Sequence, residues 1–384
     1  MNTITISEEQ ALWFRARRGF LAGPGAADAA SVARALVGVQ AQQEGPARLA
    51  LSQRMAARPN VAALQAALTA VPEGLVHTWG QRDTLFFFEL ADWADVVAAR
   101  DQWGPGRRLG PRPSLETLAA CGEVVEAADA LMTKGVVDGL VPESLLEGLL
   151  PYAEKAQMEP LRFATTRVMW ALAQGGTVSL AGKRGAERLY GARTWLFPEM
   201  AWPQDPDPVQ AAARLARRYL ASYAPATPAD IAQFFGARVR EVRVWLEALM
   251  GELVTVECGD RKGLLALAAD ADALRETPGD EQDWPVRLLP LWDSLLMGHK
   301  DKSWLLPEPA DGKRVWRPGA YVTATVHARG KIVATWKHEP RKRGLRVKVT
   351  PLSGWRASFA EAVAAEAQIV ATHLELPEAA VTIT

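Results

Sequence analysis

The sequence of 384 residues predicts an α+β fold made of helical units that each end in a β-hairpin, followed by a strand-rich C-terminal region. Three observations lead to this prediction. Apolar residues recur with helical periodicity over roughly the first 250 residues. Short alternating segments with Gly-rich turns follow successive groups of helices. From Trp284 onward the period changes to two, which is typical of strands.

The first unit is predicted over residues 1–100. Helices are expected near residues 7–20, from residue 29, and directly after Pro46, which suits a first helical turn. Residues 76–89 are rich in aromatic side chains and bounded by turn residues, which predicts a pair of strands. Three helices followed by a two-stranded ribbon is the plan of a winged helix.

The same order of elements recurs twice without strong sequence identity. A second winged-helix unit is predicted over residues 114–197, after a Gly/Pro/Arg linker at 101–113 and with a hairpin at 175–197. A second linker at 198–208 precedes a third unit, predicted over residues 209–275. The chain is therefore expected to carry three tandem winged helices.

The third unit has the clearest helix start, and the C-terminal region the clearest strands. Thr227 is expected to cap a helix that begins at Pro228. Residues 284–384 form the last predicted domain, a small antiparallel sheet or barrel. An amphipathic helix at 358–374 and a short strand at 380–384 close it.

Composition excludes several classes of protein. Hydrophobic residues make up 49% and charged residues 23%, which argues against a disordered chain. The sequence contains no apolar run long enough to predict a membrane-spanning helix. The first ten residues lack the pattern of a signal peptide. Cys121 and Cys258 lie too far apart for a CxxC pair, and two cysteines provide no disulfide framework. A cytoplasmic protein without a membrane partner is expected.

The charges sum to zero but are unevenly placed. Forty-four basic and 44 acidic residues argue, on average, against a nucleic-acid partner. Residues 329–348, however, hold eight basic residues and a single acid, Glu339, which gives this stretch a charge of +7. Clustered cations face solvent or a polyanion, so Arg341, Lys342 and Arg343 are candidate phosphate contacts.

Other charged residues carry weaker signals. Lys183 and Arg184 lie at the expected tip of the second hairpin, where they could contact phosphate or simply be solvated. A metal site could be suspected at Asp293, His299 and Asp301, whose side chains are of types that bind metals. No second His or Cys lies at the spacing of a metal-binding motif, so the sequence argues against such a site. The sequence therefore predicts no metal and no cofactor.

The segment Val39-Gln40-Ala41-Gln42-Gln43 ends the second predicted helix. On a helix Gln40 and Gln42 would point about 200° apart, but in an extended segment they share a face. Gly38 and Pro46 permit the helix to end here, so two amides could project into one site. An amide donates and accepts hydrogen bonds but is no base at pH 7. A polar helix terminus without a function explains the same spacing.

Four stretches, in order along the chain, carry a resemblance to a known family. They are LVGVQAQQEGPARLALSQR (36–54), LVHTWGQRDTLFFF (75–88), RYLASYAPATPADIAQFFG (218–236) and LLPLWDSLLMGHKDKSWLL (288–306), the last followed by GKIVATWKHEPRKRGLRVKVTPL (330–352). Together they resemble the AlkZ/YcaQ family of winged-helix DNA glycosylases over nearly the whole chain.

The resemblance implies a C-shaped cradle of three winged helices and a β-barrel that grips duplex DNA. Gln40 and Gln42 match the catalytic pair of the family's QxQ branch, and Arg82, His299 and Lys302 become DNA-contact candidates. The implied reaction is hydrolysis of the N-glycosidic bond of alkylated purines, chiefly N7-alkylguanine, with unhooking of interstrand cross-links in some members. The expected partner is double-stranded DNA with alkylated bases, bound by a monomer in the nucleoid.

The implied chemistry suits two amides. N7-alkylation makes the purine a cation, so it can leave without a general acid, and the enzyme need only place a water and stabilise charge. Asp83 and Phe86 stand where the family usually has glycine and histidine. The alternative is a non-catalytic winged-helix DNA-binding protein, a transcription regulator or damage binder. Such a protein has no use for paired amides, so the pair favours the enzyme.

Overall fold

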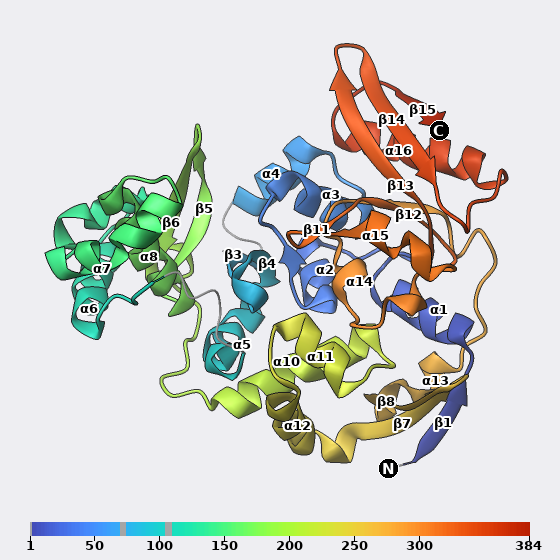
Figure 1. Ribbon diagram of the computed structural model, residues 1–384, viewed down its shortest axis with the longest axis horizontal. Coiled ribbons are helices and arrows are strands. Elements are labelled where there is room, and N and C mark those ends of the chain that lie inside the picture. The colour runs from blue at the N-terminus through green and yellow to red at the C-terminus, as the bar shows by residue number, and fades with distance from the viewer. Residues whose placement is uncertain (1, 70–73, 104–109) are drawn as a thin grey trace.

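The computed structural model describes residues 2–69, 74–103 and 110–384 and has an α+β fold with helices and strands interspersed along the chain (Figure 1). Within these ranges the strands form two five-stranded sheets, one three-stranded sheet and one two-stranded sheet. Residues 104–109, the middle of the expected linker, lie outside the described ranges. No helix in the described ranges is long and apolar enough to cross a membrane.

The N-terminal region contains the expected three helices and strand pair, together with two short strands, β1 (Thr3–Ile6) and β2 (Val39–Gln40), and two further helices, α4 (Val61–Thr69) and α5 (Trp93–Ala98). The expected elements are α1 (Glu8–Arg18), α2 (Ala29–Leu36), α3 (Glu44–Arg54), β3 (Leu75–Trp79) and β4 (Leu85–Glu89). Ser7 and Gln10 form a capping box that fixes the start of α1. β1 pairs in parallel with β7, far along the chain, so the N-terminus is part of a distant sheet.

Residues 115–196 form a lobe of their own, at the left of Figure 1. It contains α6 (Leu115–Glu126), α7 (Glu143–Lys155), α8 (Pro160–Gln174), β5 (Val178–Arg184), β6 (Glu187–Ala192) and α9 (Arg193–Leu196). The hydrophobic core of the lobe also contains Trp79 of β3 and Leu85 of β4, and β5 meets β3 through a single residue pair, His77 with Leu180. This pair joins the two hairpins into one sheet of order β2-β4-β3-β5-β6.

The third helical region shares its core with the first. Its elements are α10 (Pro208–Tyr223), α11 (Pro228–Phe235), α12 (Val239–Ala248), β7 (Leu253–Cys258), β8 (Arg261–Leu267) and α13 (Ala271–Leu274). Thr227 caps α11 as the sequence predicts, and Asp230 completes the capping box. One hydrophobic cluster contains side chains of α2, α3 and β4 together with side chains of α10, α11 and α12. These two regions therefore form one body.

The predicted C-terminal barrel is wrong in the described residues, where the strands form an open sheet. The elements are β9 (Arg287–Leu289), α14 (Ser294–Met297), α15 (Gly312–Val315), β10 (Trp316–Arg317), β11 (Tyr321–Val322), β12 (Thr325–Ala328), β13 (Lys331–Arg341), β14 (Gly344–Pro351), α16 (Phe359–His373) and β15 (Ala379–Ile383). The larger sheet has the order β15-β14-β13-β12-β9, with β9 and β15 as unjoined edges. β15 pairs with β14 in parallel, so the predicted antiparallel arrangement is also wrong at this edge, because α16 returns the chain to the same end of the sheet. Alternating residues predict strands, but they do not determine whether the sheet closes.

A buried ion pair fastens α3 to the C-terminal region. The Arg54 guanidinium donates two hydrogen bonds of 2.8 Å to the Asp293 carboxylate, and both side chains are 0% exposed. Arg54 also donates to the carbonyls of Gly19 and Ala50, while Asp293 accepts from the backbone N–H of Leu295. The pair is therefore fully hydrogen-bonded, which is the condition under which burial of two charges is tolerated.

Removal of one partner is expected to be costly. Asp293→Ala leaves a buried, unpaired guanidinium, so the free energy of unfolding should fall by about 3–5 kcal/mol, measured by urea denaturation. The matched control is Glu339→Ala, which breaks the exposed pair with Arg341 and should change stability by less than about 1 kcal/mol. Similar small effects of both variants would contradict a structural role for the buried pair.

Candidate active site and nucleic-acid interface

The two candidate catalytic glutamines lie on an extended segment. β2 pairs with β4 in antiparallel register, Gln40 opposite Phe86, and the N–H of Ala41 donates to the Leu85 carbonyl at 2.7 Å. β2 ends at Gln40, and Gln42 lies in a bend just beyond it, so the shared face that the sequence predicts for the two amides stays a prediction. The helix therefore ends before Gln40, as the sequence permits, and the two amides lie two residues apart at the end of this short strand.

A tight turn separates α2 from this strand. Val37 ends the helix at φ 53°, and Gly38 follows at φ 94°. A Cβ at residue 38 would lie 2.5 Å from a ring carbon of Phe88, so only glycine fits. Gln81 donates to the Val37 carbonyl at 3.2 Å, and the Ser294 hydroxyl donates to the Gly38 carbonyl at 3.4 Å. The backbone before Gln40 is thus held from two sides.

Most of the hydrogen-bonding capacity of the two amides remains available. Gln42 is exposed, and its Oε1 accepts from the backbone N–H of Leu85 at 3.3 Å. Gln40 is half-buried, and its amide makes no hydrogen bond within the described part of the chain. An amide offers two donors and one acceptor oxygen. The pair can therefore bind a water and a polar ligand together.

The two departures from the family's strand lie next to these glutamines. Phe86, at the usual histidine position, is 1% exposed and lies directly across the ladder from Gln40. Arg82 and Asp83, at φ 57° and 53°, form the tight turn between β3 and β4. Such a turn favours glycine, and aspartate is among the few other residues that adopt it readily. Asp83 also accepts a hydrogen bond from Gln174 at 3.3 Å.

Arg82 and two other DNA-contact candidates are engaged within the fold. Arg82 donates to the carbonyl of Phe234, and burial lowers its pKa to about 10. Nζ of Lys302 donates to the carbonyls of Leu296 and His299 at 2.9 and 2.5 Å, and burial lowers its pKa to about 8. His299 is 3% exposed, with Nε2 2.8 Å from the Tyr223 carbonyl. Arg82 and Lys302 are half-buried and His299 is buried, and each lies against backbone carbonyls; their contact with DNA stays a prediction.

The opposite face of the strand carries a titratable cluster that the sequence did not single out. His77 shares this face with Phe87 and Val39. Burial lowers the pKa of His77 to about 4, so the imidazole is neutral at pH 7. Burial raises the pKa of Glu44, but the hydrogen bond with Lys183 and the charges of nearby basic side chains together outweigh it, so the pKa is lowered. The only sequence signal for Glu44 is its position directly after the glutamines.

The two hairpins carry the remaining candidate cations. Lys183 on β5 pairs with Glu44 of α3 at 2.7 Å and is still 46% exposed. Arg184, the next residue, is exposed and has no ion-pair partner within the described ranges. Lys183 thus ties the side lobe to the helix that follows the glutamines, while Arg184 is free to meet a phosphate.

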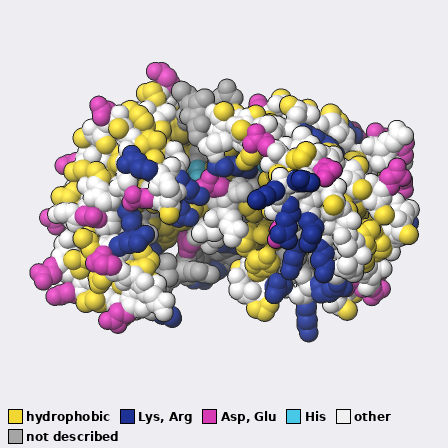
Figure 2. All heavy atoms as spheres, turned by 90° about the horizontal axis from the view of Figure 1, so that it is seen from above, with side chains coloured by type: hydrophobic (Ala, Val, Ile, Leu, Met, Phe, Trp, Pro, Cys, Tyr) yellow, Lys and Arg dark blue, Asp and Glu magenta, His cyan; other side chains and the backbone are white. Residues whose placement is uncertain are grey.

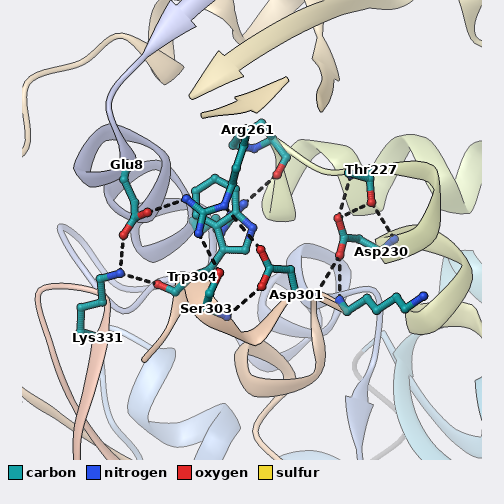
Figure 3. Close-up of polar contacts among 11 residues, drawn as sticks. Glu8, Thr227, Asp230, Arg261, Asp301, Ser303, Trp304 and Lys331 are labelled. Atoms are coloured by element: carbon teal, nitrogen blue, oxygen red, sulfur yellow. Dashed lines mark hydrogen bonds and ion pairs between the residues drawn. The ribbon is translucent and has the colours of Figure 1, made fainter. Parts of the chain in front are cut away.

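The +7 stretch divides into a structural part and an exposed part. Lys331 bonds to Glu8 and to the Trp304 carbonyl in a network that also contains Arg261 (Figure 3). Arg329 pairs with Glu9. The other six cations are exposed on the β13–β14 hairpin: Lys337, Arg341, Lys342, Arg343, Arg346 and Lys348.

The register of this hairpin gathers four of these cations on one face. Lys337 lies opposite Lys348, and Arg346 lies opposite Glu339, which pairs with Arg341. The other face, including Val347, is buried beneath α16. Figure 2 shows the resulting band of Lys and Arg side chains, and further basic side chains across a hollow on the side lobe. Candidate phosphate contacts therefore stand on both sides of the hollow.

Comparison with known protein families identifies the family of this chain. The family model described as DNA glycosylase AlkZ-like matches residues 33–373. The chain belongs to the AlkZ-like DNA glycosylase family.

A curated relative and a solved structure, both from Streptomyces sahachiroi, are similar to this chain. The chain is 26% identical over 342 residues to an interstrand DNA cross-link repair glycosylase, covering 86% of this chain and 88% of the relative. The solved structure of the S. sahachiroi DNA glycosylase AlkZ matches with a TM-score of 0.81 at 23% identity, covering 99% of this chain and 100% of that one. The structural match shows a shared fold. Membership of the AlkZ-like family makes the chain an enzyme, so a non-catalytic regulator is set aside.

The close approach of Gly38 to Phe88 gives a sharp test of the strand's position. Gly38→Ala should lower the free energy of unfolding by about 1–3 kcal/mol, because a Cβ is strained at this φ and collides with the ring. It should also reduce base release, since Gln40 follows two residues later. Thermal unfolding and a base-release assay on alkylated DNA measure the two effects.

The matched control for this variant is Gly45→Ala. A Cβ at residue 45, in the first turn of α3, meets nothing within 4 Å, so stability should stay the same or rise slightly. If both alanine variants behave alike, the turn at Gly38 does not determine the position of the glutamines.

Proposed function

We propose that this enzyme hydrolyses the N-glycosidic bond of cationic N7-alkylated purines in duplex DNA, with Gln40 and Gln42 as its catalytic residues. The observation that supports this most directly is the pair of amides two residues apart at the end of β2. The backbone is held at the turn before them, and most of their hydrogen-bonding capacity is free to bind a ligand. Basic hairpins on both sides of the adjoining hollow support a duplex substrate.

The proposed reaction needs no proton donor to the base. The bond between C1′ and N9 breaks, and its electron pair neutralises the positive charge of the purine. A water oxygen then forms the new bond to C1′ and releases its proton to solvent. The carbonyl oxygens of the amides orient this water and face the positive charge that develops at the sugar, which is the kind of stabilisation that preorganised dipoles provide.

The surroundings of the glutamines agree with chemistry that uses neither acid nor base. His77 is neutral at pH 7 and lies on the other face of the sheet. Phe86 places an apolar ring opposite Gln40, where the family usually has histidine. A neutral base such as uracil would require protonation to leave, so it should not be a substrate.

The DNA grip is proposed to come from three winged helices and the C-terminal sheet. Three groups of helices are each followed by an antiparallel hairpin, at β3–β4, β5–β6 and β7–β8. Arg341, Lys342, Arg343 and Arg184 are the proposed phosphate contacts, joined by Lys183 where it remains exposed. One chain provides the glutamines and both basic surfaces, which supports action as a monomer on nucleoid DNA.

Cross-linked DNA is a proposed substrate as well. The S. sahachiroi relative is named as an interstrand DNA cross-link repair glycosylase, and the chain covers 88% of its length. A cross-link through purine N7 leaves each attached purine with the same positive charge as a methyl adduct. The same pair of amides could therefore release both kinds of lesion.

Substitution of the glutamines tests the catalytic proposal. Gln40→Ala and Gln42→Ala should each slow release of 7-methylguanine about 100-fold or more, because each removes a preorganised polar contact to the transition state. Folding should be retained, as circular dichroism would show. The released base is measured by mass spectrometry with enzyme in excess over methylated DNA.

Gln43→Ala is the matched control, since Gln43 is an exposed glutamine next to Gln42, at the N-cap of α3, and its side chain makes no capping hydrogen bond. It should release the base at close to the unaltered rate. Equal loss in all three variants, or efficient uracil release by the unaltered enzyme, would contradict the proposed mechanism.

The β13–β14 hairpin is tested through the salt dependence of binding. Replacing Arg341, Lys342 and Arg343 with serine should weaken binding to any duplex and make the slope of log K against log salt shallower by about 0.9 per lost contact. The unaltered slope should itself be well short of about −10, because few phosphates are contacted. Lys262→Ser, at an exposed position on β8, is the control. An unchanged slope in the triple variant would place DNA elsewhere.

A further inference from the structure

A second basic surface lies outside the hollow, in a pocket of about 610 Å³ where α1, α2, α10 and α13 meet. Four arginines from three helices line it: Arg17 and Arg18 of α1, Arg34 of α2 and Arg218 of α10. Neither the glutamines nor any residue of the β5–β6 and β13–β14 hairpins contributes to its wall. The established family activity gives this pocket no role.

The arginines face the pocket while most of their partners lie behind them. Arg17, Arg18 and Arg34 have side chains 44%, 42% and 55% exposed. Asp270 and Glu89, the partners of Arg18 and Arg34, are only 10% and 15% exposed and are not part of the pocket wall. The wall therefore presents four cations and one carboxylate, that of Glu276.

Each exposed guanidinium has hydrogen-bond donors to spare. Arg17 bonds through Nη1 to Glu276, Arg18 through Nη2 to Asp270, and Arg34 through Nη1 to Glu89. The other N–H groups of these three side chains have no hydrogen-bond partner among the described residues. A guanidinium carries five N–H donors, and its fork geometry suits phosphate oxygens.

We propose that this pocket binds a small soluble molecule carrying two or more phosphate groups, such as a nucleoside diphosphate. Its volume lies within the range of about 300–1,000 Å³ typical of small-ligand sites. A concave site of this size suits a compact anion, whereas a convex duplex suits the open hollow. Ser31 adds a hydroxyl, and Phe20, Ala35 and Ala221 add an apolar side to the wall.

The pocket also adjoins the proposed active site through α2. Arg34 and Ala35 line the pocket in the last turn of this helix, which ends at Leu36, four residues before Gln40. A ligand that holds Arg34 therefore contacts the element that leads directly into the glutamines.

Calorimetric titration of the full chain with inorganic pyrophosphate, at fixed ionic strength, tests the proposal. One saturable site is expected, with a dissociation constant at least about tenfold larger in Arg17→Ala/Arg34→Ala, because two of the phosphate-facing groups are lost. These ion pairs are half exposed, so the variant should fold. If it does not, Arg34→Gln alone should still weaken binding.

Two control variants of this chain complete the experiment. Arg214→Ala removes an arginine of similar exposure on α10 that pairs with Asp95 outside the pocket, and it should bind pyrophosphate normally. The hairpin variant with serine at residues 341–343 should also bind normally. Absence of saturable binding, equal binding by the double variant, or loss of binding in the hairpin variant would overturn the proposal. So would displacement of pyrophosphate from the hairpin variant by a short duplex.

This test does not depend on catalysis. Pyrophosphate binding is measured without DNA, so it can fail while base release by Gln40 and Gln42 is upheld, and the reverse also holds.

Discussion

The position of α3 is the constraint on which the proposed site depends. At its C-terminal end, Arg54 forms a fully buried two-bond pair with Asp293, and Gln53 donates to the Leu288 carbonyl. At its N-terminal end, Glu44 pairs with Lys183 of the side lobe. The helix therefore links the C-terminal region to the side lobe, and the glutamines directly precede it. A buried charge pair is stable only in one geometry, so the link is rigid at the Arg54 end and adjustable at the exposed Lys183 end.

The position of the two glutamines is determined by the local backbone geometry between α2 and β2. A left-handed helix end at Val37, a glycine that no other residue can replace, and pairing with β4 turn a helix terminus into a strand. Residues two apart share a face only where the backbone is extended, which is how the proposed site brings Gln40 and Gln42 together. The same residues left in a helix would have no common site, which connects backbone geometry to the proposed chemistry.

The sequence predicted local features well and long-range ones poorly. The cap at Thr227 and the β5–β6 hairpin depend on a few neighbouring residues, and both were predicted. The parallel pairing of β1 with β7 joins residues far apart in the chain. The four residues of β1 contain no local pattern that predicts which strand they pair with. The open edges of the C-terminal sheet were missed for the same reason.

Charge was the least predictable property of single residues. Arg82, His299 and Lys302 appeared to be surface contacts, but their partners are backbone carbonyls that come near only after folding. The net charge of zero does not predict which cations stay exposed either, because ion pairs form between residues that are neighbours in space rather than in sequence. Of the +7 stretch, Arg329 and Lys331 bind acids of α1, whereas the β13–β14 hairpin remains a basic surface.

The central claim is that the strand bearing Gln40 and Gln42 meets the lesion sugar of a duplex held along the basic hairpins. The most direct test is a crystal structure with DNA containing N7-methylguanine on a 2′-fluoro sugar, which resists cleavage because fluorine disfavours positive charge at C1′. The account predicts a water within about 2.7–3.2 Å of both amides and next to C1′, with phosphates along β13–β14. A duplex bound to another face, or a lesion sugar beyond the reach of both amides, would contradict it.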